Sequence, residues 1–302
     1  MVARDSAGRD GTGYADESVS VRPAPALRPY IARYDGYRQA GVGPATHAGL
    51  PSPFLTVIVT LDEPLVIAEH PDPSQPAGEY VTLAGGLHTA PALITHDGRQ
   101  SGIQLALSPI GARAILGLPA GDLASIDVEG SDVIGPLAAE LQQRVQAAGS
   151  WPDRFAVLDD MLSRRVRGYL DSGRPDVSPE VAASWQRLLA TGGTVRIGAL
   201  ATETGWSDRH LRARFAAEVG LTPKAAARVI RFYRARRLLL RRAACAPAGA
   251  GLDLAGLAAE CGYYDQAHLD AEFRALAGGA PTTWLAREYR NLQAVALAAE
   301  RG

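Results

Sequence analysis

The pattern of hydrophobic positions divides the chain into a β-rich part and a helical part. Between residues 21 and 110, short apolar runs at 54–61, 64–70, 79–86 and 102–109 are separated by Pro and Gly. Short strands with turn signals between them are typical of a sandwich or barrel. From residue 110 onward, apolar side chains recur every three or four positions, which predicts helices over Gly111–Leu118, Val133–Ala148 and Arg154–Leu170.

A linker and a second helical region follow. Residues 173–178 are polar and contain Gly and Pro, and Ser178-Pro179 supplies an N-cap and a first-turn proline. Helices are expected near 179–190, 195–204, 208–219, 223–242, 253–260, 265–277 and 281–290. We predict an α+β chain with a flexible tail (1–20), a small β-barrel domain with helices (21–172), the linker (173–178), an all-α domain (179–291) and a C-terminal tail (292–302).

Charge separates the same two parts. The formal net charge is only −1, but residues 1–175 carry 14 basic and 20 acidic side chains, whereas residues 176–302 carry 17 and 12. Between Arg209 and Arg242 there are 11 basic residues and one acid, Glu218. This asymmetry favours nucleic-acid binding by the C-terminal part, although an arginine-rich surface alone does not establish it.

An imperfect repeat lies within this basic region. Its copies are LATETGWSDRHLRARFAAEVGLTP (200–223) and LAAECGYYDQAHLDAEFRALAGGAP (257–281). In each copy an Ala precedes a Gly by four residues, an aromatic residue follows the Gly, and an Asp, Asp208 or Asp265, can cap the next helix. A small residue lets two helices approach, and the Gly can end the first in the left-handed conformation. Each copy therefore predicts a helix-turn-helix, and the basic helix between the copies can hold both units at a fixed separation.

The repeat and the segment RVIRFYRARRLL between its copies make residues 178–291 resemble the AraC/XylS family of transcription regulators. This resemblance implies a double-stranded DNA operator as partner and a variable sensor or dimerisation domain at the N-terminus. Residues 21–170 have the size and the order of elements of a degenerate, cupin-like sensor barrel. The segments that carry this second resemblance are RPAPALRPYIARYDGY, AGGLHTAP and LSPIGARAILGLP.

The resemblance also assigns groove-facing residues by position. They are Arg209, Arg212 and Ala213 in the first recognition helix and Gln266, Ala267, His268, Asp270 and Ala271 in the second. Backbone amides near Ser207 and Tyr264 are expected to suit phosphates. Arg can contact guanine in a bidentate manner, and Gln can contact adenine, so Arg209 and Arg212 are the strongest base-reading candidates.

Departures from the family pattern fall mostly in the second unit. Ala213 and Ala271 stand where the family often has a basic residue, and Asp270 places an acid on the second recognition helix. Ala280 replaces the Ser or Thr that caps the helix at Pro281, whereas its counterpart Thr222 is kept. We therefore expect the second unit to contribute less base readout than the first.

No motif for catalysis or for a metal is present. The barrel histidines include no His-x-His pair, the two cysteines, Cys245 and Cys261, form no metal motif, and no cofactor is expected. If the barrel holds a small organic effector, Tyr80, His88 and His96 are weak candidates for polar groups in its pocket. One alternative is a ligand-independent regulator, whose N-terminal domain only dimerises or binds a protein. Another is a DNA-linked enzyme, but neither cysteine has the surroundings expected of a nucleophile.

The remaining expectations concern partners and location. The helices at 133–170 could serve a homodimer, and RNA polymerase is a further partner implied by the family. The absence of an apolar run of about 18 residues predicts no membrane span, and the N-terminal residues lack the features of a signal peptide. The two cysteines form no disulfide framework, so a reducing cytoplasm is the expected location.

Overall fold

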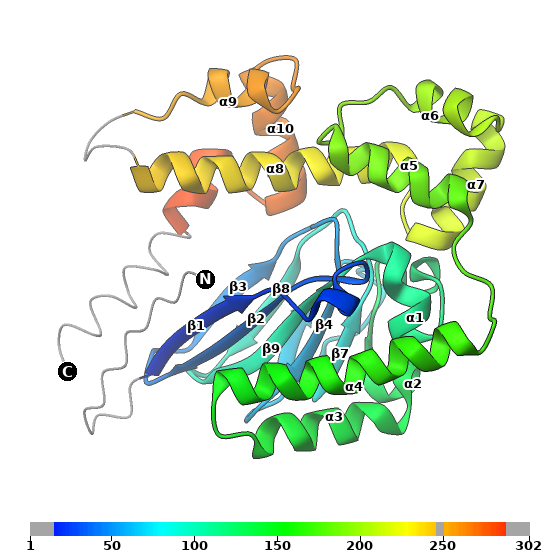
Figure 1. Ribbon diagram of the computed structural model, residues 1–302. Helices are drawn as coiled ribbons and strands as arrows, with labels where there is room; N and C mark the ends of the chain where they lie inside the picture. Colours follow the sequence, from blue (N-terminus) through cyan, green and yellow to red (C-terminus); the bar gives the residue numbers. More distant parts are fainter. Residues whose placement is uncertain (1–14, 246–250, 288–302) are drawn as a thin grey trace.

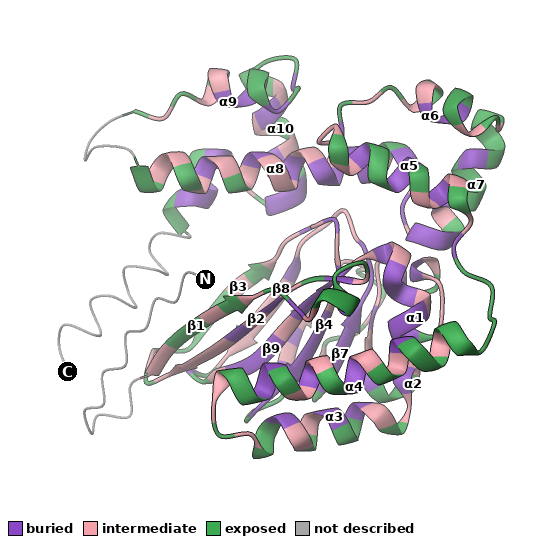
Figure 2. Ribbon diagram, viewed as in Figure 1, coloured by how far each residue is buried: buried purple, intermediate pink, exposed green. Residues whose placement is uncertain are grey.

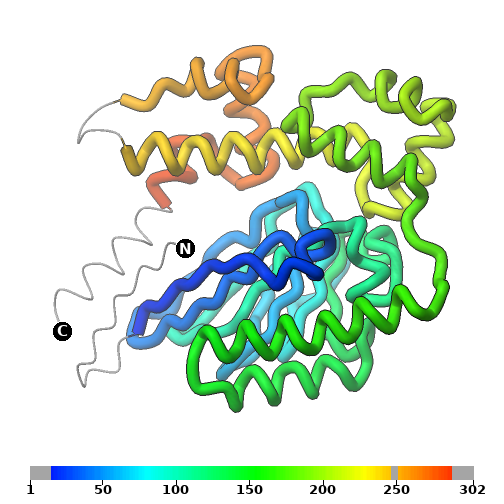
Figure 3. The backbone as a smooth tube through the Cα atoms, in the orientation of Figure 1, coloured from blue at the N-terminus to red at the C-terminus, as the bar shows by residue number. Residues whose placement is uncertain are grey.

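The computed structural model describes residues 15–245 and 251–287 and shows a two-part molecule (Figure 1). A β-rich N-terminal domain lies below a row of C-terminal helices, and the tube drawing shows one segment of the chain that passes from the first to the second (Figure 3). This segment is residues 172–178. The predicted α+β class is therefore confirmed. No helix among the described residues is long and apolar enough to cross a membrane.

The larger sheet has six antiparallel strands in the order β1-β2-β9-β4-β7-β10. Its buried central strands, β4 and β9, carry the apolar runs that were predicted as strands. The bounds are β1 (Ala15–Val21), β2 (Ile31–Ala40), β9 (Gln100–Leu107), β4 (Leu55–Thr60), β7 (Thr82–Gly85) and β10 (Asp127–Glu129).

The smaller sheet has four antiparallel strands, which are β3 (Ala45–Gly49), β8 (Ala92–His96), β5 (Leu65–Glu69) and β6 (Gly78–Tyr80), in that order. The two sheets share no backbone ladder among the described residues, so the small β-barrel predicted from the sequence is corrected to two open sheets. Closure would require the edge strands of one sheet to pair with those of the other, and the edge strands β6 and β10 are only three residues long.

The predicted tail at 1–20 also needs correction. Residues 1–14 lie outside the described part, but β1 begins at Ala15 and pairs along its whole length with β2, from Ala15 opposite Ala40 to Val21 opposite Tyr34. Its polar, partly exposed residues resemble a tail in sequence. The predicted C-terminal tail at 292–302 lies outside the described residues.

Helices cover one face of the larger sheet. The main ones are α3 (Pro136–Ala147) and α4 (Trp151–Asp171), which lie across the sheet in Figure 1 and bury one side of each helix (Figure 2). Leu141, Val145 and Leu158 enter the same core as Val57 and Ile103. The helix predicted over Val133–Ala148 is broken at Gly135 (φ 60°), which separates α2 (Gly130–Ile134) from α3. The shorter elements are η1 (Pro25–Leu27), η2 (Pro109–Gly111), α1 (Ala112–Leu116) and η3 (Ala120–Leu123).

The C-terminal domain is all-helical, as predicted. Its helices are α5 (Pro179–Ala190), α6 (Ile197–Thr204), α7 (Asp208–Val219), α8 (Pro223–Cys245), α9 (Leu254–Glu260) and α10 (Gln266–Ala277), and residues 281–287 are also helical. Ser178 caps α5 as expected, because its side chain accepts a hydrogen bond from the Val181 amide.

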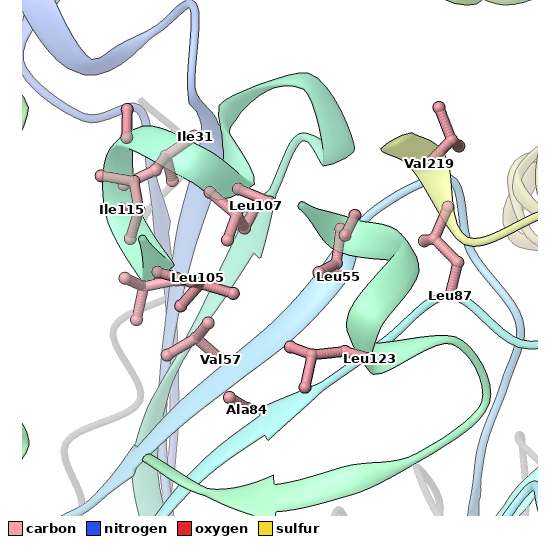
Figure 4. Packing of buried hydrophobic residues seen from close by; sticks show 14 of the residues in the cluster. Ile31, Leu55, Val57, Ala84, Leu87, Leu105, Leu107, Ile115, Leu123 and Val219 are labelled. Atoms are coloured by element: carbon pink, nitrogen blue, oxygen red, sulfur yellow. The ribbon is translucent and has the colours of Figure 1, made fainter. Parts of the chain in front are cut away.

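The N-terminal domain is docked on the first half of the C-terminal domain. Val219, at the end of α7, lies beside Leu87 and above Leu123 (Figure 4), and all three belong to one hydrophobic core that runs through both domains. Arg113 of α1 donates two hydrogen bonds of 2.9 Å to the buried Glu218 carboxylate of α7. The first helix-turn-helix is thus packed as a continuation of the N-terminal domain.

Candidate DNA interface and ligand site

The first helix-turn-helix unit consists of α6 and α7. Gly205 ends α6 with a φ of 70°, a left-handed conformation that glycine adopts without strain. The Ser207 hydroxyl then accepts a hydrogen bond from the His210 amide at 3.3 Å and caps α7. Leu211 and Phe215 are fully buried, so the opposite face of α7 is left to solvent.

The second unit repeats this design with α9 and α10. Gly262 has a φ of 77°, and the Asp265 carboxylate accepts a hydrogen bond of 2.8 Å from the His268 amide. Leu269 and Phe273 are fully buried. The prediction that Asp208 is the equivalent cap in the first unit is wrong. One residue rather than two separates the Gly from the cap there, so Ser207 takes the capping position and Asp208 begins the helix.

Most of the predicted groove-facing side chains are exposed on these two helices. In α7 Arg209, Arg212 and Ala213 are exposed, and neither arginine forms an ion pair with the described residues. In α10 Gln266, Ala267 and Ala271 are exposed, whereas His268 and Asp270 are half-buried. Among the described residues, the solvent-facing surface of α7 therefore carries positive charge without an ion-pair partner. The predicted groove-facing residues of α10 are uncharged apart from the half-buried Asp270.

The starts of the recognition helices contain aromatic contacts. The ring of His210 lies edge-on to Trp206 at 4.6 Å, and the ring of His268 lies edge-on to Tyr263 at 5.2 Å. His268 Nδ1 also accepts a weak hydrogen bond of 3.4 Å from the Tyr264 amide. The Tyr264 side chain is 93% exposed, an unusual position for a large ring unless a partner covers it.

Helix α8 joins the two units. Val229 and Ile230 in its first half belong to the core of the first unit, while Phe232, Ala235 and Leu239 belong to a separate core with the second. Ion pairs of 2.6 Å from Arg228 to Glu272 and from Arg242 to Glu260 add to the second attachment. Because one continuous helix contributes side chains to both cores, α8 can act as the spacer that the sequence predicts.

Comparison with known families agrees with this geometry. A family model described as a helix-turn-helix domain matches residues 200–287, which include both units and the helix between them. The protein carries the AraC-type DNA-binding domain. Because it carries this domain, the protein is a DNA-binding transcription regulator. A second model, described as a domain of unknown function (DUF6597), matches residues 19–129. No curated protein sequence matches the chain.

Similar solved structures include several of ToxT from Vibrio cholerae. One is 12% identical and has a TM-score of 0.47, with 83% of this chain and 97% of that chain covered. ToxT bound to an unsaturated fatty acid is 9% identical, with a TM-score of 0.47 and coverage of 92% and 96%. ToxT bound to (E)-4-(8-methylnaphthalen-1-yl)but-3-enoic acid is 12% identical, with a TM-score of 0.46 and coverage of 83% and 97%. The ligands named are those of ToxT.

A hollow of about 240 Å³ lies between the two sheets of the other domain. Its apolar wall is formed by Ile58, Leu65 and Ile94. The polar side chains that line it are Asp16, Glu17, Ser18, Tyr37, Arg38, Gln39, His47, Gln100 and Gln104. Burial raises the pKa of Tyr37 to about 12, so its hydroxyl stays protonated. Burial, and to a smaller extent His96, lowers the pKa of His47 to about 4 and keeps that imidazole neutral near pH 7. The hollow can thus offer uncharged hydrogen-bonding groups beside the ionisable side chains of Asp16, Glu17 and Arg38.

The three effector residues suggested from sequence are not brought together. His96 lines a neighbouring hollow of about 270 Å³ that shares Tyr37, Leu65 and Gln100 with the first. Tyr80 is instead hydrogen bonded to His70 Nε2 (3.2 Å), whose Nδ1 is bonded to Asp127 (2.8 Å) in a buried network. The His88 ring is hydrogen bonded to the nearby Ala90 carbonyl.

Sequence reasoning missed the polar residues of β2 and β9. Tyr37, Gln39, Gln100 and Gln104 lie on strands that cross the larger sheet, and every second side chain of a strand faces the same side. That alternation was the only available signal, and it does not tell which face is turned to the second sheet. No group of three or more metal-binding side chains occurs within residues 15–245 and 251–287.

Proposed function

We propose that the regulator binds its operator with α7 and α10 in consecutive major grooves of one face of the duplex. The observation that carries this proposal is α8, which is packed into the cores of both units and so fixes their separation. Consecutive major grooves on one face lie about 34 Å apart, and each admits one helix. A single polypeptide then covers both grooves.

Base readout is assigned mainly to the first unit. Arg209 and Arg212 are exposed on α7 with free guanidinium donors for guanine O6 and N7. In α10, Asp270 has a buried carboxylate oxygen without a hydrogen-bond partner among the described residues, and it brings negative charge close to the groove-facing surface. Gln266 is the main base-reading candidate that remains there, with Ala267, His268 and Ala271 as close neighbours of the DNA.

Selection of bound sites from randomised duplexes tests this assignment. We expect the wild type to select a motif that spans two adjacent major grooves. Arg212→Ala should lose about 1–3 kcal/mol of binding free energy at one base pair and relax the base preference there. Gln266→Ala should lose less binding free energy. Arg214→Ala removes an exposed arginine from the same helix, outside the predicted set, and should leave the base preference unchanged.

Two results would contradict the assignment. Equal losses for Gln266→Ala and Arg212→Ala would show that the second unit reads bases as strongly as the first. Binding by the wild type that is weak, salt-sensitive and independent of sequence would show that this chain alone does not read an operator.

We further propose that the hollow between the sheets binds a small organic effector. Its combination of an apolar wall with polar side chains, among them the ionisable Asp16, Glu17 and Arg38, is typical of small-molecule sites. The alternative is an N-terminal domain that only dimerises or binds a protein. A homodimer through α3 and α4 and a contact with RNA polymerase remain proposals, as does the cytoplasmic location that a chromosomal regulator would need.

A substitution that fills the hollow distinguishes an effector-binding domain from one that only dimerises or binds a protein. Ile94→Trp should abolish saturable binding of an uncharged, apolar fluorescent probe such as N-phenyl-1-naphthylamine, because the indole takes the volume beside Ile58 and Leu65. Ala48→Trp, which adds the same ring at an exposed position of β3, should retain it. Equal probe binding by Ile94→Trp and wild type would place any ligand elsewhere. Titration followed by fluorescence, with DNA binding as a folding control, gives the result.

A further inference from the structure

A second hollow, outside both sites described above, is lined almost entirely by basic and small residues. It has a volume of about 380 Å³ and is lined by residues of α1, of the C-terminal half of α4 and of the start of the linker. Four arginines line it, Arg113, Arg164, Arg165 and Arg174, and no acidic side chain does. Such a concentration of guanidinium groups around one space indicates an anionic occupant.

The charges around this hollow are only partly neutralised. Arg113 is paired with Glu218, and Arg164 is paired with Asp160 at 2.8 Å. Arg165 donates from Nε to the Ile115 carbonyl at 3.0 Å, and neither it nor Arg174 has a carboxylate partner among the described residues. The hydrogen bond to Glu218, and to a smaller extent the charge of Asp122, raises the pKa of Arg113. Burial, and then the charge of Asp176, raises the pKa of Tyr169, but neither Asp122 nor Asp176 lines the hollow.

The surroundings of Arg165 support the same conclusion. Partial burial lowers its pKa, and the nearby Arg174 lowers it further, so the two cations repel each other in the absence of an anion. Small residues keep the space open. A Cβ added at Gly168 would meet no heavy atom within 4 Å, and one at Gly117 would meet only the Arg165 guanidinium, at 3.3 Å.

We propose that this hollow, the arginine pocket, binds a phosphate group of a small phosphorylated metabolite. A phosphate dianion matches the two unpaired guanidiniums in charge, and its oxygens can accept paired N–H bonds from an arginine fork. The volume exceeds that of a phosphate alone and leaves room for the organic part of such a molecule. This binding does not depend on the proposed function.

The arginine pocket is directly connected to the first recognition helix. Arg113 lines the pocket and also holds Glu218, which is buried on α7 behind the DNA-reading surface. A bound phosphate competes with Glu218 for the Arg113 guanidinium and brings a second negative charge toward it. Phosphate binding and the Arg113–Glu218 contact therefore oppose each other, and this antagonism is reciprocal. A metabolite in the pocket would loosen the docking of the N-terminal domain on α7.

Calorimetric titration of the full chain with inorganic phosphate and with pyrophosphate tests the pocket. We expect one saturable site that chloride at equal ionic strength does not fill. Arg174→Gln, and separately Gly168→Glu, which supplies a carboxylate to the open space, should each weaken binding about tenfold or more, as loss of a charge-assisted contact does. Arg167→Gln removes an exposed arginine of α4 that does not line the pocket, and it should bind as the wild type does.

The connection to α7 is tested separately, because it predicts a variant with higher affinity for phosphate than the wild type. Glu218→Gln removes the competing charge and should tighten phosphate binding several-fold. Unchanged affinity in this variant would refute the antagonism. Absence of a saturable site, or equal weakening by Arg174→Gln and Arg167→Gln, would refute the pocket. If Arg174→Gln instead weakens non-specific duplex binding and reduces its salt dependence without affecting free phosphate, the anion is the DNA backbone and the proposal is wrong.

Discussion

Replacement of Phe273 by alanine is expected to unfold the second helix-turn-helix unit while leaving the rest of the protein folded. The ring is completely buried and packs against Phe232 at 5.0 Å and Trp284 at 5.9 Å between centroids. Its removal should cost about 3–5 kcal/mol. The core around it contains few residues and is separate from the main core, so this loss approaches the total stability expected for so small a unit.

Hydrogen exchange resolved along the chain is the measurement for Phe273→Ala. Protection should disappear from residues 254–287 and persist in the sheets and in α7. Phe215→Ala is the matched variant, because its ring occupies the equivalent position and packs against Trp185 in the core shared with the N-terminal domain. It should lower protection in both domains together. If Phe273→Ala destabilises the N-terminal sheets as much as Phe215→Ala does, the two cores are not independent.

Gly121→Ala should break the docking between the N-terminal domain and the first recognition helix. A Cβ at this position would lie 2.1 Å from the carbonyl oxygen of Ala217, and a backbone atom inside a helix cannot move aside cheaply. Overpacking of this kind costs about 1–3 kcal/mol. To remove this steric overlap, η3 has to separate from the end of α7, and that movement would also pull Arg113 away from Glu218. We therefore expect more expanded molecules in small-angle scattering and faster exchange at residues 216–221.

Gly149→Ala is the control for this variant, since nothing lies within 4 Å of a Cβ there and the residue has no positive φ. It should leave scattering and exchange unchanged. A Gly121→Ala protein with the wild-type radius of gyration and undiminished protection of α7 would mean that the docked arrangement is not held by this contact.

Local sequence signals predicted the C-terminal domain well. Gly205 and Gly262 end their helices in the left-handed conformation, and Ser178, Ser207 and Asp265 cap the helices that follow. These features depend on a few neighbouring residues, so the sequence shows them directly. The single error, the cap assigned to Asp208, came from imposing one spacing on two turns of different length.

The N-terminal domain was predicted less completely because its strands interact over long distances. The apolar runs of β4 and β9 were recognised, but the polar edge strands β1 and β3 carry no such run. Their strand conformation is stabilised by pairing with β2 and β8, which a local pattern does not reveal. For the same reason, the sequence pattern predicted a barrel where the structure has two open sheets. It also did not identify the polar residues that line the hollow between the sheets.

Repeats, caps and helical periodicity are local features, and they were enough to predict the two helix-turn-helix units, the basic helix between them and the DNA-binding role. The packing of whole elements in the folded protein shows, in addition, that the first unit shares a core with the N-terminal domain while the second has its own. The folded structure also shows the ion pair between Arg113 and Glu218, and it shows that arginines from α1, α4 and the linker line one hollow. Contacts between residues about a hundred positions apart depend on how whole elements pack, and no local pattern of side chains encodes them.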